Sequence, residues 1–487
     1  MCNKYFRLFS LIFVLLLQLP LVSCGGGFNT NNFPVVVFSD VHFNPFDDTS
    51  LFTSLVLTDA SGWEGVFQQS YKMTPSTYGY DTNYPLLMIA LSSIRQNLGA
   101  SPLVVYTGDI LGHNFSEQFY ALYYGSLGVP VPPPADIAKD PAAVAAMEAF
   151  ANKTVAFFMD QVRSSVGNIP VMFTVGNSDS YLGIVPEPSF LANTAELYHT
   201  KFLNSSTDHQ AFLDSFKKGG YYSMEPPGTN LMVIGINTVL CAFPDNTTTA
   251  RFDEELHWLD TTLTAAKAAD KKVWLLMHIP PGADIDSTAV KADNGQIDIM
   301  KNAVMMWQPP PTYTYQADFL TILANHPGVV TLTLAAHTHM DEFRIMSPDN
   351  VTPADVLEIT PSITPIFGNN PAFKVFTFSR DTLKPIDYRS LNYDLATMPR
   401  RFHSYYTFRA AYCLSGYLND SLAQLYPALK TNTVQQKLYQ RHYYSGNTPQ
   451  PPISAQHVPI TQTNWPIFWS GIGNMDQQDF FNSVNSY

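Results

Sequence analysis

The chain has 487 residues, of which 46% are hydrophobic and only 14% are charged. This composition supports a large buried core and excludes a globally disordered chain, and the length suits a large catalytic domain with a smaller appendage. The net charge of −13 argues against binding to nucleic-acid duplexes, because no basic stripe offsets the repulsion from their phosphates.

The N-terminus resembles an export signal. Lys4 and Arg7 precede an apolar run from Leu8 to Leu17, which is too short to span a bilayer comfortably. We therefore expect a signal peptide over residues 1–24 and an extracytoplasmic protein, either secreted or in a lysosome-like compartment. The run that ends at Cys24 is also similar to a bacterial lipobox, so a lipid anchor at Cys24 remains an alternative.

Cysteines and sequons give weaker indications. Cys241 and Cys413 can either pair or remain free thiols, and the sequence does not decide between these alternatives. Asn-x-Ser/Thr sequons favour a secreted glycoprotein only weakly, because a Ser/Thr-rich chain contains them by chance. They lie at Asn114, Asn152, Asn204, Asn246, Asn350 and Asn419.

Apolar runs rich in β-branched residues predict strands that are buried on both faces. They cover residues 34–38, 103–106, 171–175, 231–236, 273–277 and 329–334. Helical spacing of apolar residues predicts helices over 141–162 and 252–269. This alternation predicts a layered α/β (α+β) catalytic domain over residues 30–391. Strand-like runs fade after it, so residues 392–487 are expected to form a smaller, mostly helical subdomain.

Potential metal ligands directly follow five of these predicted strands. In chain order they are Asp40 and His42, Asp109, Asn177, His278, and His337 and His339. Because sites form outside the carboxyl ends of strands, we expect these side chains to meet at one edge of the fold.

Each of these short patterns is uninformative by itself. A single histidine beside apolar residues is usually a core or surface residue, and an aspartate or asparagine after glycine usually occupies a turn. The order Asp-x-His, Gly-Asp, Gly-Asn, His, His-x-His, with each element placed after a strand, is hard to obtain by chance. Together the five elements predict a binuclear metal site.

These motifs resemble those of the calcineurin-like metallophosphoesterase family. The narrower resemblance is to the acid sphingomyelinase-like phosphodiesterases, and we expect no saposin-like segment, as in the saposin-lacking members. It rests on the segments 38–45, 107–113, 274–282, 337–343 and 361–375, and loosely on 464–469. The resemblance implies a metallophosphoesterase β-sandwich flanked by helices and a hydrolase acting on phosphoric ester bonds.

The resemblance also implies the distribution of the ligands between two divalent metal ions. One ion would take Asp40, His42, Asp109 and His339, and the other would take Asp109, Asn177, His278 and His337. Asp109 would bridge them, as a carboxylate with two oxygens can. Imidazole and oxygen ligands without thiolate suit zinc, iron or manganese, and the resemblance favours zinc.

One position departs from the family pattern in a way that concerns catalysis. Most relatives have histidine, a candidate general acid, at the position of Ser178, whose alcohol is too weak an acid to deliver a proton. His113 matches the family's other active-site histidine and remains the candidate acid. The expected catalytic residues are therefore His113, Asp109 and Asn177. The alternative is that His113 positions the phosphate or a ligand. Without a second acid, phosphoanhydrides such as nucleotides or polyphosphate, whose leaving group is a phosphate, should be handled better than sphingomyelin.

Several functional alternatives remain open at this point. The chain can be a phosphodiesterase, an endopolyphosphatase or nucleotide phosphohydrolase, or a sphingomyelin phosphodiesterase proper. An inactive relative that acts as a binding module is the non-enzymatic alternative, against which the complete ligand set argues. The expected substrate is a phosphate-containing small molecule, polyphosphate or a phospholipid. Aromatic residues such as Tyr80, Trp307 and Trp469 either contact substrate or a membrane surface, or belong to the core.

Overall fold

The computed structural model describes residues 31–203, 208–293, 303–308, 312–348, 355–448 and 457–487. The predicted signal peptide with Cys24, and the sequons at Asn204 and Asn350, lie outside the described residues. Within them, Cys241 is buried, Cys413 is exposed, and both are free thiols.

Two mixed six-stranded sheets form the centre of the fold. The first has the order β14-β13-β12-β1-β2-β3 and the second β10-β11-β9-β6-β5-β4, and β7 and β8 form a separate pair. The strands are β1 (Asn32–Phe38), β2 (Val104–Tyr106), β3 (Val171–Phe173), β4 (Tyr222–Met224), β5 (Leu231–Gly235), β6 (Lys272–Leu276), β7 (Ala283–Asp284), β8 (Val304–Met305), β9 (Val330–Ala335), β10 (Glu342–Met346), β11 (Asp355–Ile359), β12 (Ala372–Ser379), β13 (Pro385–Tyr393) and β14 (Phe402–Thr407).

The sheets pack face to face, and the alternation of side chains along β6 shows this directly. Trp274 joins the core that also contains residues of β1 and β12, and its ring stacks on Phe378 with centroids 4.1 Å apart. Val273 and Leu275 point the other way, into a second core with residues of α10 and α13. Both faces of β6 are therefore buried, which explains its continuous apolar sequence.

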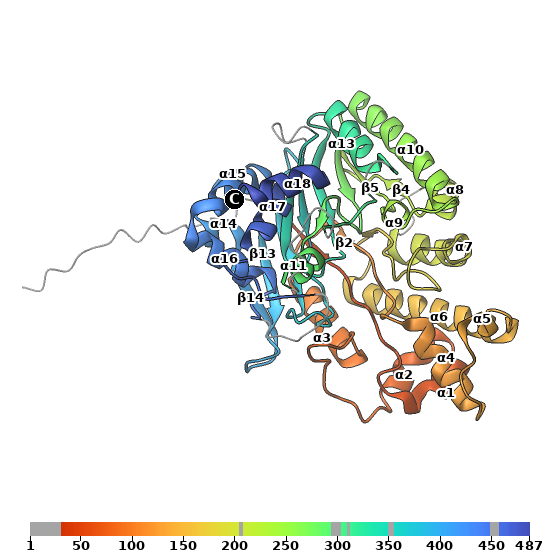
Figure 1. Cartoon of the computed structure of the whole chain (residues 1–487). Coiled ribbons are helices and arrows are strands. Elements are labelled where there is room, and N and C mark those ends of the chain that lie inside the picture. The colour runs from red at the N-terminus through yellow and green to blue at the C-terminus, as the bar shows by residue number, and fades with distance from the viewer. Residues whose placement is uncertain (1–30, 204–207, 294–302, 309–311, 349–354, 449–456) are drawn as a thin grey trace, which may run out of the picture.

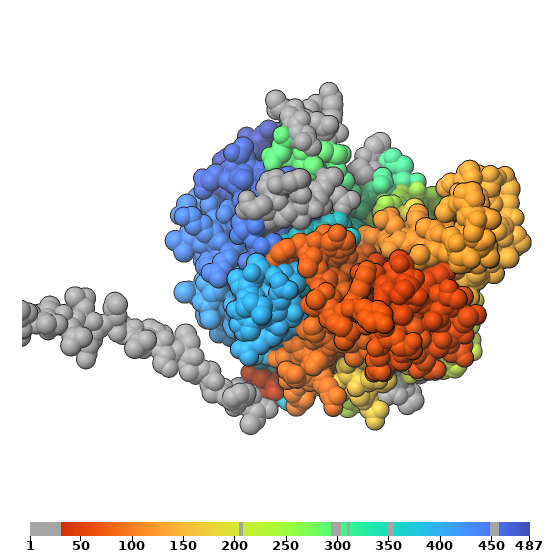
Figure 2. Space-filling model, turned by 90° about the horizontal axis from the view of Figure 1, so that it is seen from below, coloured from red at the N-terminus to blue at the C-terminus, as the bar shows by residue number. Residues whose placement is uncertain are grey.

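Helices cover the sandwich on its outer sides, with α10 and α13 over the second sheet (Figure 1). They are α1 (Phe52–Leu57), α2 (Trp63–Phe67), α3 (Tyr84–Asn97), α4 (Phe115–Ser126), α5 (Pro134–Ile137), α6 (Pro141–Val166), α7 (Pro188–Leu197), α8 (His209–Gly219), α9 (Val239–Ala242), α10 (Thr248–Ala268), α11 (Ile285–Asp293), α13 (Tyr315–Asn325), α14 (Phe408–Tyr412), α15 (Leu418–Thr431), α16 (Thr433–Tyr443), α17 (Trp465–Gly473) and α18 (Gln477–Asn485). Figure 2 shows the red and orange N-terminal part directly beside the blue C-terminal part, so distant segments share one surface.

The predicted fold class is confirmed, since a layered α/β sandwich with flanking helices is present. The predicted helix over 141–162 is α6. By length and composition alone this helix could cross a membrane, but half of its most apolar 18-residue stretch is buried inside the protein. Helices α14 to α18 follow residue 392 as expected, but β13 spans that residue and β14 extends the same sheet. The division of the chain into domains stays a prediction.

The aromatic residues with a possible contact to substrate or a membrane surface differ in burial. Trp307, Phe468 and Trp469 are buried in the core. Tyr80 is 67% exposed, and the hydroxyl of Tyr78 donates to Asn370 Oδ1. The two tryptophans, Trp307 and Trp469, therefore belong to the core.

Candidate metal centre

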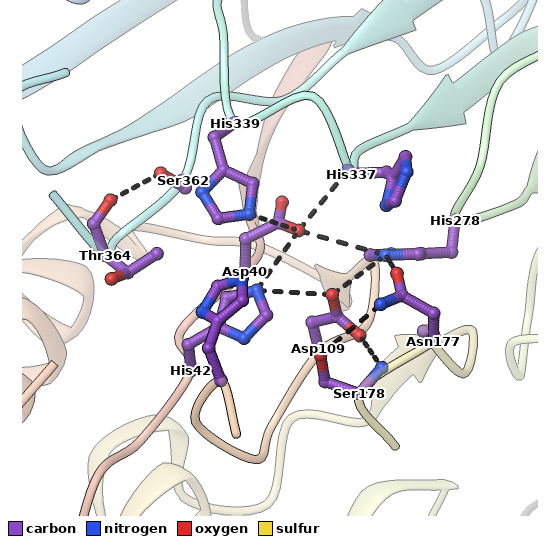
Figure 3. Close-up of polar contacts among 12 residues, drawn as sticks. Asp40, His42, Asp109, Asn177, Ser178, His278, His337, His339, Ser362 and Thr364 are labelled. Carbon is purple, nitrogen blue, oxygen red and sulfur yellow. Dashed lines mark hydrogen bonds and ion pairs between the residues drawn. The ribbon is translucent and has the colours of Figure 1, made fainter. Parts of the chain in front are cut away.

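The predicted ligands come from the carboxyl ends of strands in both sheets. β1, β2 and β3 of the first sheet lead into Asp40 and His42, Asp109, and Asn177, and β6 and β9 of the second lead into His278, and His337 and His339. The structure brings all seven together (Figure 3). The sequence predicted the strand ends correctly, but the site lies between two sheets and not at the edge of one.

Asp109 occupies the centre of this cluster. Its Oδ2 lies 3.2 Å from His42 Nε2 and 3.1 Å from His278 Nε2, so one oxygen faces imidazoles from both sheets. Asp40 Oδ1 lies 3.6 Å from His339 Nε2, and the His337 backbone N–H donates to the same oxygen at 3.3 Å. Both carboxylates thus connect ligands that are far apart in the sequence.

The hydrogen bonds of two histidines fix which ring nitrogen faces the cluster. His42 Nδ1 lies 3.0 Å from the carbonyl oxygen of Leu111, and His278 Nδ1 lies 2.7 Å from that of Thr107. A carbonyl only accepts, so Nδ1 carries the proton and Nε2 is left with its lone pair when the ring is neutral. Metal-binding histidines are commonly held in this way.

The donor set divides into overlapping groups that could each hold a metal ion. Asp40, His42 and Asp109 form one group, and Asp109, His278 and His337 form another, with the ligand atoms of each group within 4.8 Å of one another. Asn177 Oδ1 lies 3.2 Å from His278 Nε2 and joins the second group. A third group consists of His42, His113 and His339, so Asp109 and His42 each belong to two groups. The distribution of the ligands between two ions stays a prediction.

Unpartnered polar atoms support the same conclusion. Asp40 Oδ2 and His339 Nδ1 are buried and make no hydrogen bond within the described protein. Such atoms are costly unless a ligand, an ion or water satisfies them. The donor chemistry and these atoms together fit a pair of divalent cations.

The backbone is strained at most of these positions. Asp40, His42, Asp109, His337 and His339 all adopt positive φ, between 44° and 72°. The left-handed region costs a non-glycine residue on the order of 1–3 kcal/mol, and such residues concentrate at functional sites. The strain is therefore consistent with a binding function for the cluster.

A buried carboxylate joins two of the ligand loops. Asp179 accepts hydrogen bonds from the backbone N–H groups of Asp109 (3.0 Å), Ile110 (2.8 Å) and Gly176 (2.8 Å). The Ser178 backbone N–H donates to Asp109 Oδ1 at 2.7 Å. Asp179 therefore ties the loop after β2 to the loop after β3.

Charge within the cluster is concentrated on Asp109. Burial favours neutral imidazoles, but the Asp109 carboxylate outweighs it and raises the pKa of both His42 and His278 to about 9. Burial raises the pKa of Asp40 to about 7. In the protein alone, protons on His42 and His278 therefore balance Asp109, and cations could take over that role.

His113 lies beside the seven predicted ligands, and its ring belongs to the group with His42 and His339. Its ring stacks on His42 with centroids 4.0 Å apart, and Asp81 holds it twice, at Nδ1 (2.8 Å) and at the backbone N–H (2.7 Å). Asp81 is buried, which favours its neutral form, but the hydrogen bond and charge of His113 outweigh burial and lower the Asp81 pKa. Sequence reasoning missed Asp81, because it follows no predicted strand and belongs to none of the motifs.

A cavity of about 450 Å³ opens onto the cluster. Its lining includes the cluster residues Asp109, His113, Asn177, His337 and His339. The rest of the lining consists of Asn114, Asp284, Asp286, Ser287, Met306, Thr338, Ile366, Phe367 and His457. We refer to the three residues Asp284, Asp286 and His457 as the distal wall. The volume lies within the range of small-molecule sites.

A helix-flanked β-sandwich that gathers imidazole, carboxylate and amide donors from five strand ends defines a binuclear metallohydrolase. Among curated proteins, sphingomyelinase phosphodiesterase C of Dictyostelium discoideum is 22% identical over 64% of this chain and 62% of its own length. Rat cyclic GMP-AMP phosphodiesterase SMPDL3A is 22% identical over 75% and 74%, and human acid sphingomyelinase-like phosphodiesterase 3b is 26% identical over 61% and 65%. The match spans less than two thirds of the Dictyostelium and human proteins.

No family model matches the chain. Among solved structures, a dimetal phosphatase from Danio rerio aligns with 74% of this chain and 95% of its own, with 13% identity and a TM-score of 0.40, which is too low to support an argument. The curated relatives are phosphodiesterases of the acid sphingomyelinase-like type, in agreement with the resemblance that the motifs indicated.

The close approach of the two ligand loops gives a first prediction. A methyl group at Gly176 would overlap Asp109 Oδ1, so Gly176→Ala should displace Asp109 and lower the bound metal per chain well below the wild-type value. Gly125→Ala, in helix α4 with open space around it, is the matched control and should bind metal normally. Elemental analysis of both purified variants checks this, and full metal content in Gly176→Ala would contradict the described loop contact.

Proposed function

We propose that this chain hydrolyses phosphodiesters with the help of two divalent metal ions, most suitably zinc, held by the seven clustered ligands. One ion would be held by Asp40, His42, Asp109 and His339, and the other by Asp109, Asn177, His278 and His337. The central position of Asp109 Oδ2 between two imidazoles is the observation that supports this most strongly. When bound, such a pair supplies positive charge for phosphate oxygens and lowers the pKa of a nucleophilic water.

The metal identity rests on ligand type. Four imidazoles, two carboxylates and one amide suit zinc, iron or manganese better than copper(I), because no thiolate is present in the set. Export is also part of the proposal, and the basic residues followed by a short apolar run at the N-terminus support it. The name of sphingomyelinase phosphodiesterase C supports the inclusion of lipid phosphodiesters among the substrates to test.

The chain's own residues then orient the substrate and supply a proton. Asp81 accepts from His113 Nδ1, which leaves Nε2 as the ring nitrogen available to the cavity. A histidine in this position can protonate the oxygen of the departing alcohol. Ser178, the other family position for an acid, is only 4% exposed, and its backbone N–H holds Asp109. His113 is therefore the proposed acid, and Asp81 is its positioning residue.

Removal of the central carboxylate tests the proposed activity directly. Asp109→Asn should abolish hydrolysis of bis(p-nitrophenyl) phosphate, by at least about 10³-fold, because the neutral amide cannot serve both groups of ligands. The assay should use wild-type protein reconstituted with zinc and compare it with Asp293→Asn, an exposed residue of α11. If reconstituted wild type does not hydrolyse the diester, or Asp109→Asn hydrolyses it equally well, the proposed function is wrong.

The role of His113 predicts a dependence on the leaving group. His113→Gln should slow alkyl phosphodiesters by about 10²-fold, but it should slow p-nitrophenyl esters much less, because p-nitrophenolate departs without a proton. Asp81→Asn should show the same pattern more weakly. The exposed His403 provides a control, His403→Gln. Equal losses for both leaving groups would show that His113 does not donate the proton.

A further inference from the structure

The distal wall places carboxylates in the same cavity as the metal cluster. Asp284 and Asp286 follow His278 closely in the sequence, in β7 and at the start of α11, whereas His457 comes from the C-terminal region. A substrate whose phosphate reaches the cluster shares this cavity of about 450 Å³ with the distal wall. These side chains therefore lie beside the path of the group that the phosphate carries.

Asp286 is fixed in position by residues of the C-terminal region. The hydroxyl of Tyr443 donates to Asp286 Oδ2 at 2.5 Å, and the Tyr444 hydroxyl, which donates to Val458 O at 2.8 Å, lies 3.3 Å from Oδ1. His457 Nε2 lies 3.9 Å from Asp286 Oδ2. Asp284 Oδ1 accepts from the Ser287 backbone N–H at 2.9 Å. These contacts fix the orientation of both carboxyl groups.

Cationic side chains are absent from the cavity lining in the described part of the chain, which includes neither lysine nor arginine. The nearby Arg344 is fully buried, donates to Gly471 O and Ala283 O, and pairs with Glu342 at 3.1 Å. Burial also lowers the pKa of His457 to about 4, so that this ring is neutral at neutral pH. Among the described residues that line the cavity, a second phosphate would meet acidic groups and no side-chain cation.

We propose that Asp284 and Asp286 determine specificity by repelling additional phosphates, so that the enzyme accepts substrates with a single phosphodiester group and rejects nucleoside triphosphates and polyphosphate. The carboxylates of Asp284 and Asp286 and an additional phosphate all carry negative charge, and like charges repel strongly in a partly buried cavity. Selectivity against a competing substrate often rests on such repulsion. The proposal rests on the phosphodiesterase activity proposed above. It opposes the expectation drawn from Ser178 that phosphoanhydrides are the better substrates, because that expectation considered only the leaving group.

The test compares two thymidine p-nitrophenyl esters, and chromatography of all thymidine-containing products counts cleavage at every phosphorus atom. p-Nitrophenyl thymidine 5′-monophosphate carries one phosphate, and the γ-p-nitrophenyl ester of thymidine 5′-triphosphate carries three. Burial raises the pKa of Asp286 to about 7, so assays at pH 8 keep its carboxylate mainly ionised. Wild type should have a kcat/KM for the monophosphate ester that exceeds the triphosphate value by about tenfold or more.

Neutralising the wall should then relax the selectivity. Asp284→Asn with Asp286→Asn should raise the ratio of kcat/KM for the triphosphate ester to kcat/KM for the monophosphate ester about tenfold above the wild-type ratio. Asp293→Asn, on the same helix but exposed, should change neither value. Asp284→Asn alone gives a smaller change in the same direction and serves if the buried change at Asp286 prevents folding.

The possible outcomes separate the two proposals. If wild type hydrolyses both esters equally well, or if the double variant leaves the ratio unchanged, the wall does not select the substrate, although the phosphodiesterase activity stands. If wild type hydrolyses neither ester with metal bound, the proposed function fails and the specificity proposal fails with it.

Discussion

The contact between Asp109 Oδ2 and the Nε2 atoms of His42 and His278 is the interaction on which the rest of the site depends. It places a carboxylate between imidazoles that belong to different sheets, in an interior where an unbalanced charge is costly. The surrounding structure holds this contact in place. Asp179 ties two ligand loops together, Gly176 permits their close approach, and carbonyl oxygens orient the rings.

The two-sheet architecture explains why the ligands are so widely separated in sequence. Neither sheet alone supplies both sides of the cluster, since Asp109 belongs to the first and His278 to the second. The sandwich core, with Trp274 stacked on Phe378, keeps the two sheets in a fixed relation. The metal centre is thus a consequence of sheet packing, and distant changes that shift one sheet against the other should affect it.

Much of the site could be predicted from the sequence, because its ligands directly follow buried strands that have distinctive apolar runs. The strands β1, β2, β3, β5, β6 and β9 were recognised in this way. Asp81 and Asp286 could not be recognised from the sequence, because each gains its role from a tertiary partner. The partner of Asp81 is His113, and the partner of Asp286 is Tyr443. β13 and β14 were also missed, because their mixed polar and aromatic sequences resemble the helical region that follows.

The C-terminal region also contributes residues to the cavity. Tyr443, Tyr444 and His457 reach the distal wall from beyond the predicted boundary at residue 391. A catalytic domain defined by motifs alone would omit them. The chemistry at the metal centre belongs to the motifs, but the selection of substrate depends on residues that only the folded chain brings together.

A crystal structure of the zinc-loaded protein, with anomalous scattering recorded at the zinc edge, tests the central claim most directly. We expect two anomalous peaks on either side of Asp109, one bonded to Asp40, His42 and His339 and the other to Asn177, His278 and His337. A single peak, or zinc bound elsewhere with these side chains turned away from one another, would contradict it.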